Sequence, residues 1–416
     1  MTDTIAETTP RHRLGSQANR IFMASQTYGL LDFGRGFPAP IGGSGWLNDD
    51  GTLDPSHGIQ TWITCRMTHV YAIGALLGYP GAAALVDEGL RGLTGVLHDD
   101  ENGGWYPGVS WDGTPDPDKI CYTHAFVILA ASSALLAGRP GARALLDEAL
   151  DTFERRFWDE GTGLAVDTWD TAFRTLDPYR GLNANMHTTE AFLAVADATG
   201  DERYRTRAGR IIDHVVAWAK ANGWRIPEHF HEDWTPDLEC NADRKDDQFK
   251  PYGATPGHGI EWARLITQWA MSTYPGNGAA RVPYVEAAEH LFSRAVEDAW
   301  NADGAPGLVY TTDWEGRPVV HDRMHWTLAE ALNTSATLHA VTGRDEYADW
   351  YSTFCAYVDG TVIDHEGGSW FHQLDRNNKV VGSVWPGKSD LYHAFQSTLI
   401  PYLDPAVSVA SAVARD

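Results

Sequence analysis

The chain has 416 residues, of which 43% are hydrophobic and 21% charged, and this composition excludes a disordered protein. Its 56 acidic residues outnumber its 32 basic ones, and the resulting net charge of −24 disfavours nucleic acid or an anionic membrane as a partner. Aromatic residues make up 11% of the chain, including 17 tryptophans, so a carbohydrate ligand is one early hypothesis.

The N-terminal residues 1–13 are polar and lack the apolar segment of a signal peptide. Residues 120–138 carry no formal charge, but they include His124 and lie between Lys119 and Arg139, so they predict a buried helix rather than a membrane span. The four cysteines are far apart and form no CxxC pair. We therefore expect a reduced, cytoplasmic protein.

Hydrophobic periodicity predicts twelve helices in two alternating sets. The first set has few charges and should be buried on almost all sides, and it covers residues 61–77, 120–138, 183–199, 257–273, 324–341 and 389–402. The second set has one charged face, and it covers residues 13–34, 81–97, 141–157, 202–220, 284–300 and 344–359. Turn residues around short aromatic runs predict small hairpins or irregular loops at 99–115, 159–170, 301–318 and 364–379.

This alternation predicts an all-α fold, an (α/α)6 barrel with six inner and six outer helices and with hairpins and loops at one mouth. No βαβ alternation or linker is present, so we expect a single domain over residues 1–416, with a core from about 13 to 402 between a polar N-terminal and a short C-terminal tail. The starts of the inner helices would meet at the mouth. Five of these six starts contain histidine.

Two of these starts place a histidine on one helix face with another polar residue. His258 and Glu261 are three residues apart, so the carboxylate could orient the imidazole and raise its basicity. Asn183 and His187 are four residues apart and are followed by Glu190. Hydrogen bonding on the helix surface is the alternative interpretation of both pairs.

Metal binding is a competing hypothesis, because His258 with Glu261, or the acidic and histidine-rich segment 228–232, offers ligands by type. No HExxH spacing occurs, and the 228–232 segment is predicted to be an exposed loop. Phosphate-binding glycine motifs and the GxSxG motif of serine hydrolases are also missing from the sequence. We therefore expect neither a metal nor a cofactor.

Five motifs occur in order along residues 15–402. They are Arg66 on the first inner helix, N-x-x-x-H-x-x-E (Asn183, His187, Glu190), G-H-x-x-E-W (His258, Glu261, Trp262), W-x-x-A-E-A (Trp326, Glu330) and the pair Tyr392-His393. This ordered set resembles the N-acylglucosamine 2-epimerase superfamily, which includes acylglucosamine and cellobiose 2-epimerases, mannose isomerase and sulfoquinovose isomerase. Members of this superfamily are (α/α)6 barrels whose chemistry needs no metal or nucleotide.

The resemblance implies that His258 and His393 are an acid/base pair at C1 and C2 of an opened sugar, with Glu261 polarising His258. It also implies that Arg66 stabilises the enediolate oxygen. Asn183 and His187 would hold the ring oxygen and hydroxyls. Other candidates for binding the sugar are Tyr122, Trp326, Glu330, Trp385 and Asp390, and several loop tryptophans are expected around the mouth: Trp46, Trp105, Trp111, Trp169, Trp314 and Trp370.

Two details favour an isomerase. His325-Trp326 stands where cellobiose-type epimerases have two tryptophans, and the pattern K-x-D-x-Y-H-x-x-Q at 388–396 is similar to the mannose and sulfoquinovose isomerases. The leading hypothesis is interconversion of the small monosaccharides D-mannose and D-fructose, or D-lyxose and D-xylulose, through a cis-enediolate.

Three alternatives from other substrate or reaction classes stay open. The first is a sulfoquinovose isomerase, with its sulfonate held by a cation among Arg66, Arg225, Arg244 and Lys388. The second is a sugar 2-epimerase. The third is a glycoside hydrolase using Asp170 and Glu261, since hydrolysis requires two carboxylates. A non-catalytic, protein-binding role is a further possibility that the histidine set disfavours.

Overall fold

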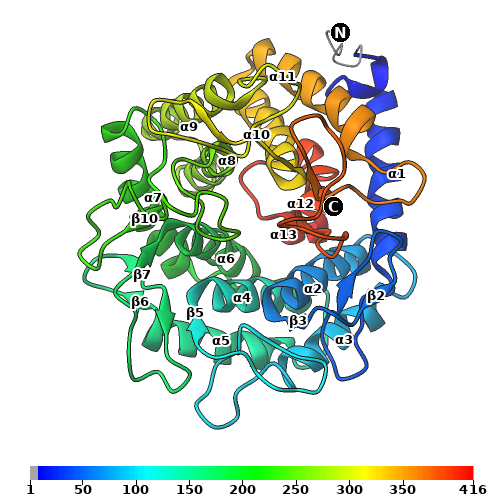
Figure 1. The fold of residues 1–416 in the computed structure, drawn as a ribbon, viewed down its shortest axis with the longest axis vertical. Coiled ribbons are helices and arrows are strands. Elements are labelled where there is room, and N and C mark those ends of the chain that lie inside the picture. The colour runs from blue at the N-terminus through cyan, green and yellow to red at the C-terminus, as the bar shows by residue number, and fades with distance from the viewer. Residues whose placement is uncertain (1–7, 416) are drawn as a thin grey trace.

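The computed structural model describes residues 8–415, whose helices form two concentric rings (Figure 1). The inner ring consists of α2 (Thr61–Leu76), α4 (Cys121–Leu136), α6 (Leu182–Thr199), α8 (Pro256–Thr273), α10 (His325–Thr342) and α12 (Tyr392–Ser397). The outer ring consists of α1 (Gln17–Gly34), α3 (Ala82–Leu93), α5 (Ala142–Arg156), α7 (Glu202–Ala221), α9 (Gly278–Ala299) and α11 (Asp345–Tyr357). Inner helices pack in chain order and α12 contacts both α10 and α2, so the ring closes and the predicted (α/α)6 barrel is confirmed.

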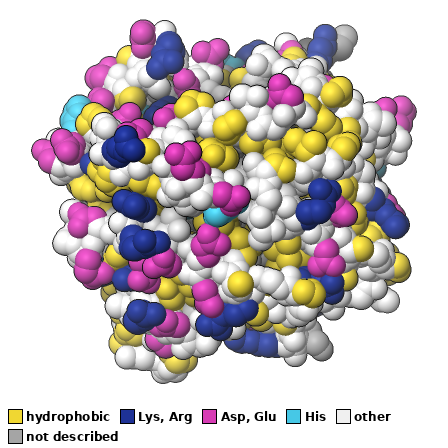
Figure 2. All heavy atoms as spheres, turned by 90° about the horizontal axis from the view of Figure 1, so that it is seen from below, with side chains coloured by type: hydrophobic (Ala, Val, Ile, Leu, Met, Phe, Trp, Pro, Cys, Tyr) yellow, Lys and Arg dark blue, Asp and Glu magenta, His cyan; other side chains and the backbone are white. Residues whose placement is uncertain are grey.

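The two rings differ in burial as their charge patterns predict. In α4 only Tyr122, Leu135 and Leu136 are not fully buried, whereas α5 alternates buried and exposed positions. Within residues 8–415 no helix is both long and apolar enough to span a membrane. Acidic and basic side chains are interspersed on the side of the barrel shown in Figure 2, so the net charge of −24 is not gathered into one patch there.

The C-terminal part of the barrel differs from the prediction. The helix expected over 389–402 is only the short α12, followed by a 3-10 turn at Ile400–Tyr402, because Pro401 lacks the N–H that a continuing helix needs. The residues expected to be a C-terminal tail form α13 (Val409–Arg415), whose first five residues are buried. This helix packs against α2, α4 and α6 at the end of the barrel opposite the mouth. The segment is small and apolar but too short for its periodicity to be recognised.

Short strands fix the starts of the inner helices. The pairs are β3 (Ile59–Gln60) with β4 (Gly108–Val109), β5 (Lys119–Ile120) with β8 (Thr168–Trp169), β9 (Arg180–Gly181) with β10 (His229–Phe230), and β13 (Arg323–Met324) with β14 (Gln373–Leu374). A bridge between Ala254 and Thr312 plays the same part before α8. The remaining pairs are the hairpins β1 (Trp46–Leu47) with β2 (Leu53–Asp54), β6 (Trp158–Asp159) with β7 (Leu164–Ala165), and β11 (Thr311–Thr312) with β12 (Pro318–Val320).

These pairs also satisfy the first backbone N–H of four inner helices. Thr61, Cys121, Leu182 and His325 donate to the carbonyl oxygens of Pro107, Asp167, Glu228 and His372, respectively. The helices α2, α4, α6 and α10 consequently begin without a side-chain cap. The starts of these four inner helices are therefore each held by the loop of the following helix pair.

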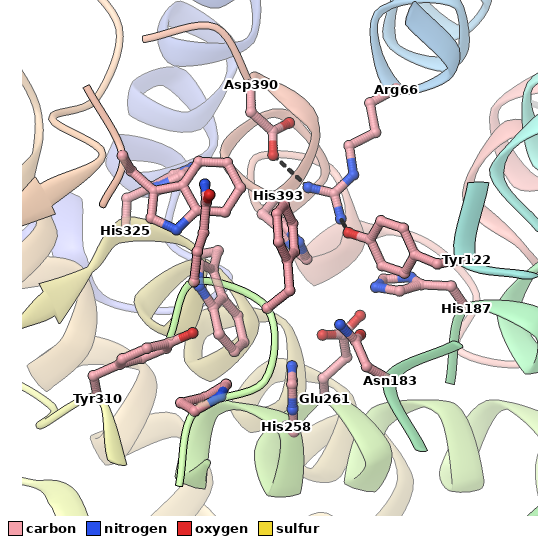
Figure 3. Close-up of a pocket in the computed structure, with 15 residues that line it drawn as sticks. Arg66, Tyr122, Asn183, His187, His258, Glu261, Tyr310, His325, Asp390 and His393 are labelled. Atoms are coloured by element: carbon pink, nitrogen blue, oxygen red, sulfur yellow. Dashed lines mark hydrogen bonds and ion pairs between the residues drawn. The ribbon is translucent and has the colours of Figure 1, made fainter. Parts of the chain in front are cut away.

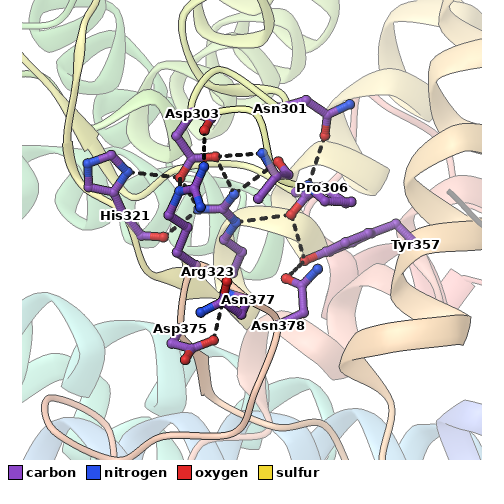
Figure 4. A network of polar contacts seen from close by, with 12 residues as sticks. Asn301, Asp303, Pro306, His321, Arg323, Tyr357, Asp375, Asn377 and Asn378 are labelled. Carbon is purple, nitrogen blue, oxygen red and sulfur yellow. Dashed lines mark hydrogen bonds and ion pairs between the residues drawn. The ribbon is translucent and has the colours of Figure 1, made fainter. Parts of the chain in front are cut away.

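Buried ion pairs reinforce three of these starts. Lys119 lies 2.7 Å from Asp99, Arg323 lies 2.8 Å from Asp303, and Lys388 lies 2.5 Å from Asp364. All three cationic side chains are completely buried. In the network of Figure 4, Arg323 also donates to the carbonyl oxygen of Pro306 at 3.1 Å. Since a buried charge is costly unless it is paired, these contacts fix the segments that lead into α4, α10 and α12.

Candidate active site

The inner helix starts converge on one cavity at the mouth (Figure 3). Every residue predicted for the isomerase site except Glu330 lines this cavity. The full lining is Arg66, Tyr122, Asn183, His187, Gln248, Phe249, Pro251, His258, Glu261, Tyr310, His325, Trp326, Trp385, Asp390 and His393. Residues that are hundreds of positions apart are thus brought together by the ring of helices.

Three histidines of the cavity each face a glutamate through Nδ1. The distances are 3.0 Å from His258 to Glu228, 2.9 Å from His393 to Glu330 and 3.3 Å from His187 to Glu190. Because a carboxylate only accepts hydrogen bonds, Nδ1 carries the proton in each pair. Nε2 is then the lone-pair nitrogen, directed away from the carboxylate, and is available for proton transfer with a ligand.

The sequence spacing suggested Glu261 as the partner of His258, but the structure shows Glu228 in that place. His258 lies in the first turn of α8, where its ring reaches Glu228 on the segment before β10. Glu228 is 5% exposed, so the 228–232 segment begins inside the barrel rather than as an exposed loop. Glu261 lies deeper, where burial and the nearby Glu330 raise its pKa well above the usual range.

Glu330 was expected to bind the sugar, but it is completely buried behind His393. It lies one helical turn deeper in α10 than Trp326, which does line the cavity. Burial would raise its pKa, but the charge of Arg264, whose Nε lies 2.8 Å away, and the bond from His393 lower it to about 2. Glu330 is thus a carboxylate that orients His393.

Arg66 is buried in α2 and is the one arginine or lysine of the lining set. One terminal nitrogen donates to Asp390 and the other to the hydroxyl of Tyr122 at 2.9 Å. Burial opposes its charge, but Asp390 outweighs this effect and raises the pKa of the guanidinium above its usual value. Arg66 consequently stays charged, with its planar group fixed at two points.

Aromatic rings form two walls of the cavity. The ring of Trp326 lies 5.1 Å from that of His258 and 5.8 Å from that of His393. At the entrance, the rings of Trp385 and Phe249 lie 6.1 Å apart, edge to face. Such flat apolar faces suit the C–H faces of a sugar.

Comparison with known proteins shows the family of this chain. The profile of the N-acylglucosamine 2-epimerase (GlcNAc 2-epimerase) family matches residues 42–397. The chain belongs to this family. It is 44% identical to the D-mannose isomerase of Thermobifida fusca and 42% identical to that of Pseudomonas cannabina pv. alisalensis, each over 402 residues, or 95% and 96% of this chain and 97% of each relative. A crystal structure of D-mannose isomerase superposes with a TM-score of 0.84 and 28% identity, covering 92% of this chain and 97% of that one. On this basis the chain is an isomerase.

The loop tryptophans were predicted around the mouth, and none of the six lines the cavity. Trp105 and Trp370 are buried in the core. The indole nitrogens of Trp111, Trp169 and Trp314 donate to the backbone carbonyl oxygens of His57, Arg156 and Leu238, respectively. Trp46 stacks on Trp385 behind the cavity lining, with ring centroids 6.4 Å apart. These indoles therefore hold the loops together.

Several lining or supporting residues were not predicted from the sequence. Gln248 and Phe249 belong to a polar loop without periodicity, and Gln248 donates to the carbonyl oxygen of Val384 across the mouth at 3.2 Å. Tyr310 precedes the β11–β12 hairpin. For Glu228 the sequence offers one indication, its place in the acidic and histidine-rich segment 228–232. No local pattern in the sequence predicts that this segment contacts α8.

Two groups of side chains are close enough to bind a metal ion: His187 with Glu190 and Glu261, and Glu261 with Glu330 and His393. Arg264 already lies among these carboxylates, with Nη2 3.8 Å from Glu261 and 3.9 Å from Glu190. Its charge, together with a proton on Glu261 that the raised pKa favours, offsets the excess negative charge. The cluster thus has a source of charge balance other than a metal.

Proposed function

We propose that this protein interconverts D-mannose and D-fructose, and D-lyxose and D-xylulose, by proton transfer through a cis-enediolate. The observation that carries the proposal is the pair His258 and His393, each held by a carboxylate at Nδ1 and each lining the cavity that contains Arg66. Two oriented bases around one oxyanion-stabilising cation are what the reaction requires. The names of the most similar relatives support D-mannose as substrate.

The reaction begins when the pyranose ring opens and presents C1 and C2 between the two histidines. One histidine takes the C2 proton at Nε2, while the electrons of the C1 carbonyl move onto O1. Arg66 stabilises the resulting enediolate oxygen. A proton then returns to C1, and the O2 hydroxyl gives its proton to O1 as the C2 carbonyl forms, which leaves the ketose. Burial lowers the pKa of His393, so its ring is neutral at pH 7 and has a lone pair that can accept a proton.

The glutamates act through the imidazoles. When a histidine takes up a proton it becomes a cation, and the carboxylate at Nδ1 stabilises that charge. Glu228 and Glu330 therefore serve His258 and His393, respectively. His187, with its pKa lowered to about 4 by burial, stays neutral and binds the sugar together with Asn183. The Asn183 Oδ1 atom is buried without a partner among the described residues, which leaves it free to accept from a hydroxyl.

The charges around the cavity favour a neutral sugar over sulfoquinovose. Of the cations considered for a sulfonate, Arg66 is balanced by Asp390, Arg225 pairs with Asp298 at 2.6 Å, and Lys388 pairs with Asp364. Arg244 is exposed and lies 3.4 Å from Asp247. All four are thus engaged with a carboxylate, and a sulfonate would have to displace one.

The geometry gives little support to hydrolysis. Asp170 accepts from the backbone N–H groups of Arg174 and Thr175 within its own hairpin and does not line the cavity. The proposed carboxylate pair of Asp170 and Glu261 is therefore not assembled. A 2-epimerase shares the first proton transfer and differs in returning the proton to C2, so the product analysis decides between these two reactions.

The test is a product panel in which the enzyme is incubated with mannose, lyxose, N-acetylmannosamine, cellobiose and sulfoquinovose and the sugars are identified by NMR. We expect fructose from mannose, with His258→Asn and His393→Asn each reducing kcat by about 10²- to 10⁴-fold. His290→Asn is the control, because His290 stacks on Trp224 outside the cavity. Glucose as the product of mannose, or full activity in either cavity variant, would refute the proposal.

A further inference from the structure

His325 begins α10 and lines the cavity with only 4% of its surface exposed. Its backbone N–H donates to the carbonyl oxygen of His372 at 3.1 Å, and its Nδ1 lies 3.2 Å from the same oxygen. A carbonyl oxygen only accepts, so Nδ1 must carry the ring proton. Nε2 of His325 is therefore a lone-pair acceptor.

This Nε2 atom is buried and has no hydrogen-bond partner among residues 8–415. Leaving a buried polar atom unpaired destabilises a fold, and such atoms usually have an explanation. Here the atom belongs to a residue of the ligand cavity, so a bound ligand can supply the missing donor. Burial, followed by the neighbouring His372, holds the pKa of His325 well below its usual value, which keeps the ring neutral.

The ring of His325 is also held in a fixed plane. The imidazole of His372 stacks on it with centroids 4.1 Å apart and planes 9° apart. His372 is 2% exposed and directly precedes β14, which pairs with the strand before α10. The direction of the acceptor is thus set by the β13–β14 pair and does not depend on the ligand.

We propose that Nε2 of His325 accepts a hydrogen bond from a sugar hydroxyl outside the reacting C1–C2 pair, at one of the carbons C3 to C6. The proposal rests on the isomerase function above, in which C1 and C2 lie between His258 and His393. A neutral acceptor repels the oxygens of a phosphate, carboxylate or sulfonate. His325 therefore selects a neutral hydroxyl donor at this point of the cavity.

The test replaces His325 with phenylalanine, which keeps the ring stack on His372 and removes the acceptor. We expect kcat/KM for D-mannose to fall roughly tenfold to hundredfold. His325→Gln should restore part of this loss, because its amide oxygen can accept. His290→Phe on α9 is the matched control and should leave activity unchanged, since His290 lies outside the cavity.

The deciding measurement uses 3-deoxy-, 4-deoxy- and 6-deoxy-D-mannose together with D-lyxose. With the wild-type enzyme, kcat/KM for one of these analogues should be lower than for D-mannose by about the factor that His325→Phe costs. With His325→Phe, the same analogue should show no further loss relative to D-mannose. Unchanged kcat/KM in His325→Phe, or an equal loss for every analogue, overturns the inference. If His325→Phe unfolds at a lower temperature than the wild type, the activity of His325→Gln decides instead. A His325→Gln variant no more active than His325→Phe contradicts the role of His325 as acceptor. A wild-type enzyme that isomerises no sugar refutes the proposed function instead.

Discussion

Nδ1 of His258 lies 3.0 Å from Oε1 of Glu228, a residue 30 positions earlier in the chain. The contact depends on the β9–β10 pair, because the carbonyl oxygen of Glu228 also accepts the first N–H of α6. The backbone of Glu228 is therefore bound to the start of α6, while its side chain orients a histidine at the start of α8, the next inner helix. In the proposed mechanism Glu228 is a positioning residue for His258.

Glu228→Gln keeps an acceptor for His258 but removes the negative charge. Because the charge stabilises the imidazolium formed during proton transfer, we expect kcat to fall about tenfold to hundredfold with little change in KM. Steady-state kinetics on D-mannose measures both. Glu232→Gln, in the exposed part of the same segment, should behave as wild type. Equal kcat in the two variants would refute the role of Glu228.

Arg66→Lys should be damaging although it conserves the charge. The guanidinium contacts Asp390 and Tyr122 at the same time, which a single ammonium group cannot do with the same geometry. We expect kcat to fall about 10²- to 10³-fold, as for the loss of one oxyanion donor. Arg210→Lys, whose partner Glu160 is on the outer surface, is the control for a generic arginine effect. Wild-type kcat in Arg66→Lys would place the enediolate oxygen elsewhere.

Most of the helices were predictable because their signals are local in the sequence. The uncharged stretch of α4 and the alternating charges of α5 are local signals. α12 and α13 were harder, since six or seven residues give too few turns for a period to show.

The site was predictable where its contacts lie within one helix. His187 and Glu190, both named in one sequence motif, are three residues apart on α6 and contact each other, as helix geometry allows. The same spacing failed for His258 and Glu261, because the strand pairing at the mouth brings Glu228 to the ring first. The loop tryptophans failed for a related reason: residue type alone does not distinguish Trp105 in a core from Trp385 in a cavity wall.

The acid limb of kcat/KM should have its midpoint below pH 6.5. In the proposed mechanism the neutral form of His393 exchanges a proton with the sugar, and burial lowers the pKa of His393 below 6.5 although Glu330 opposes the shift. The competent form therefore prevails above this lowered pKa and is lost as the pH falls through it. Rates measured from pH 4.5 to 9, with the fold monitored by circular dichroism, test this. A midpoint at or above 6.5 would contradict the assignment of His393 as the group that limits the rate.

Chelation should not affect the reaction. The carboxylates of Glu190, Glu261 and Glu330 share the charge of Arg264, and two of the three bind histidine Nδ1 atoms. We expect dialysis against EDTA to leave kcat and KM unchanged. Loss of activity that returns only when a divalent cation is added would show that the cluster around Glu261 binds a metal.

Two glycines of α8 offer a matched test of how tightly Trp326 must be held. A Cβ atom added to Gly257 would lie 2.8 Å from the Trp326 ring and 2.6 Å from the methyl carbon of Thr327, so the ring would have to move. At Gly259 the nearest atom would be 3.6 Å away, an ordinary contact. Alanine also favours the helix by roughly 0.5–1 kcal/mol at either position. Gly259→Ala should therefore keep wild-type activity and stability.

Gly257→Ala should lower kcat/KM for D-mannose by tenfold or more, because a displacement of about 1 Å in a positioning group can cost about 10²-fold. The ring of Trp326 lies beside those of His258 and His393, which transfer protons in the proposed mechanism, so the loss should appear in kcat as well as in KM. Kinetics and thermal unfolding of the two variants, measured side by side, separate this effect from a change in helix stability. If Gly257→Ala is as active as Gly259→Ala, the Trp326 wall is not what aligns the sugar with His258 and His393.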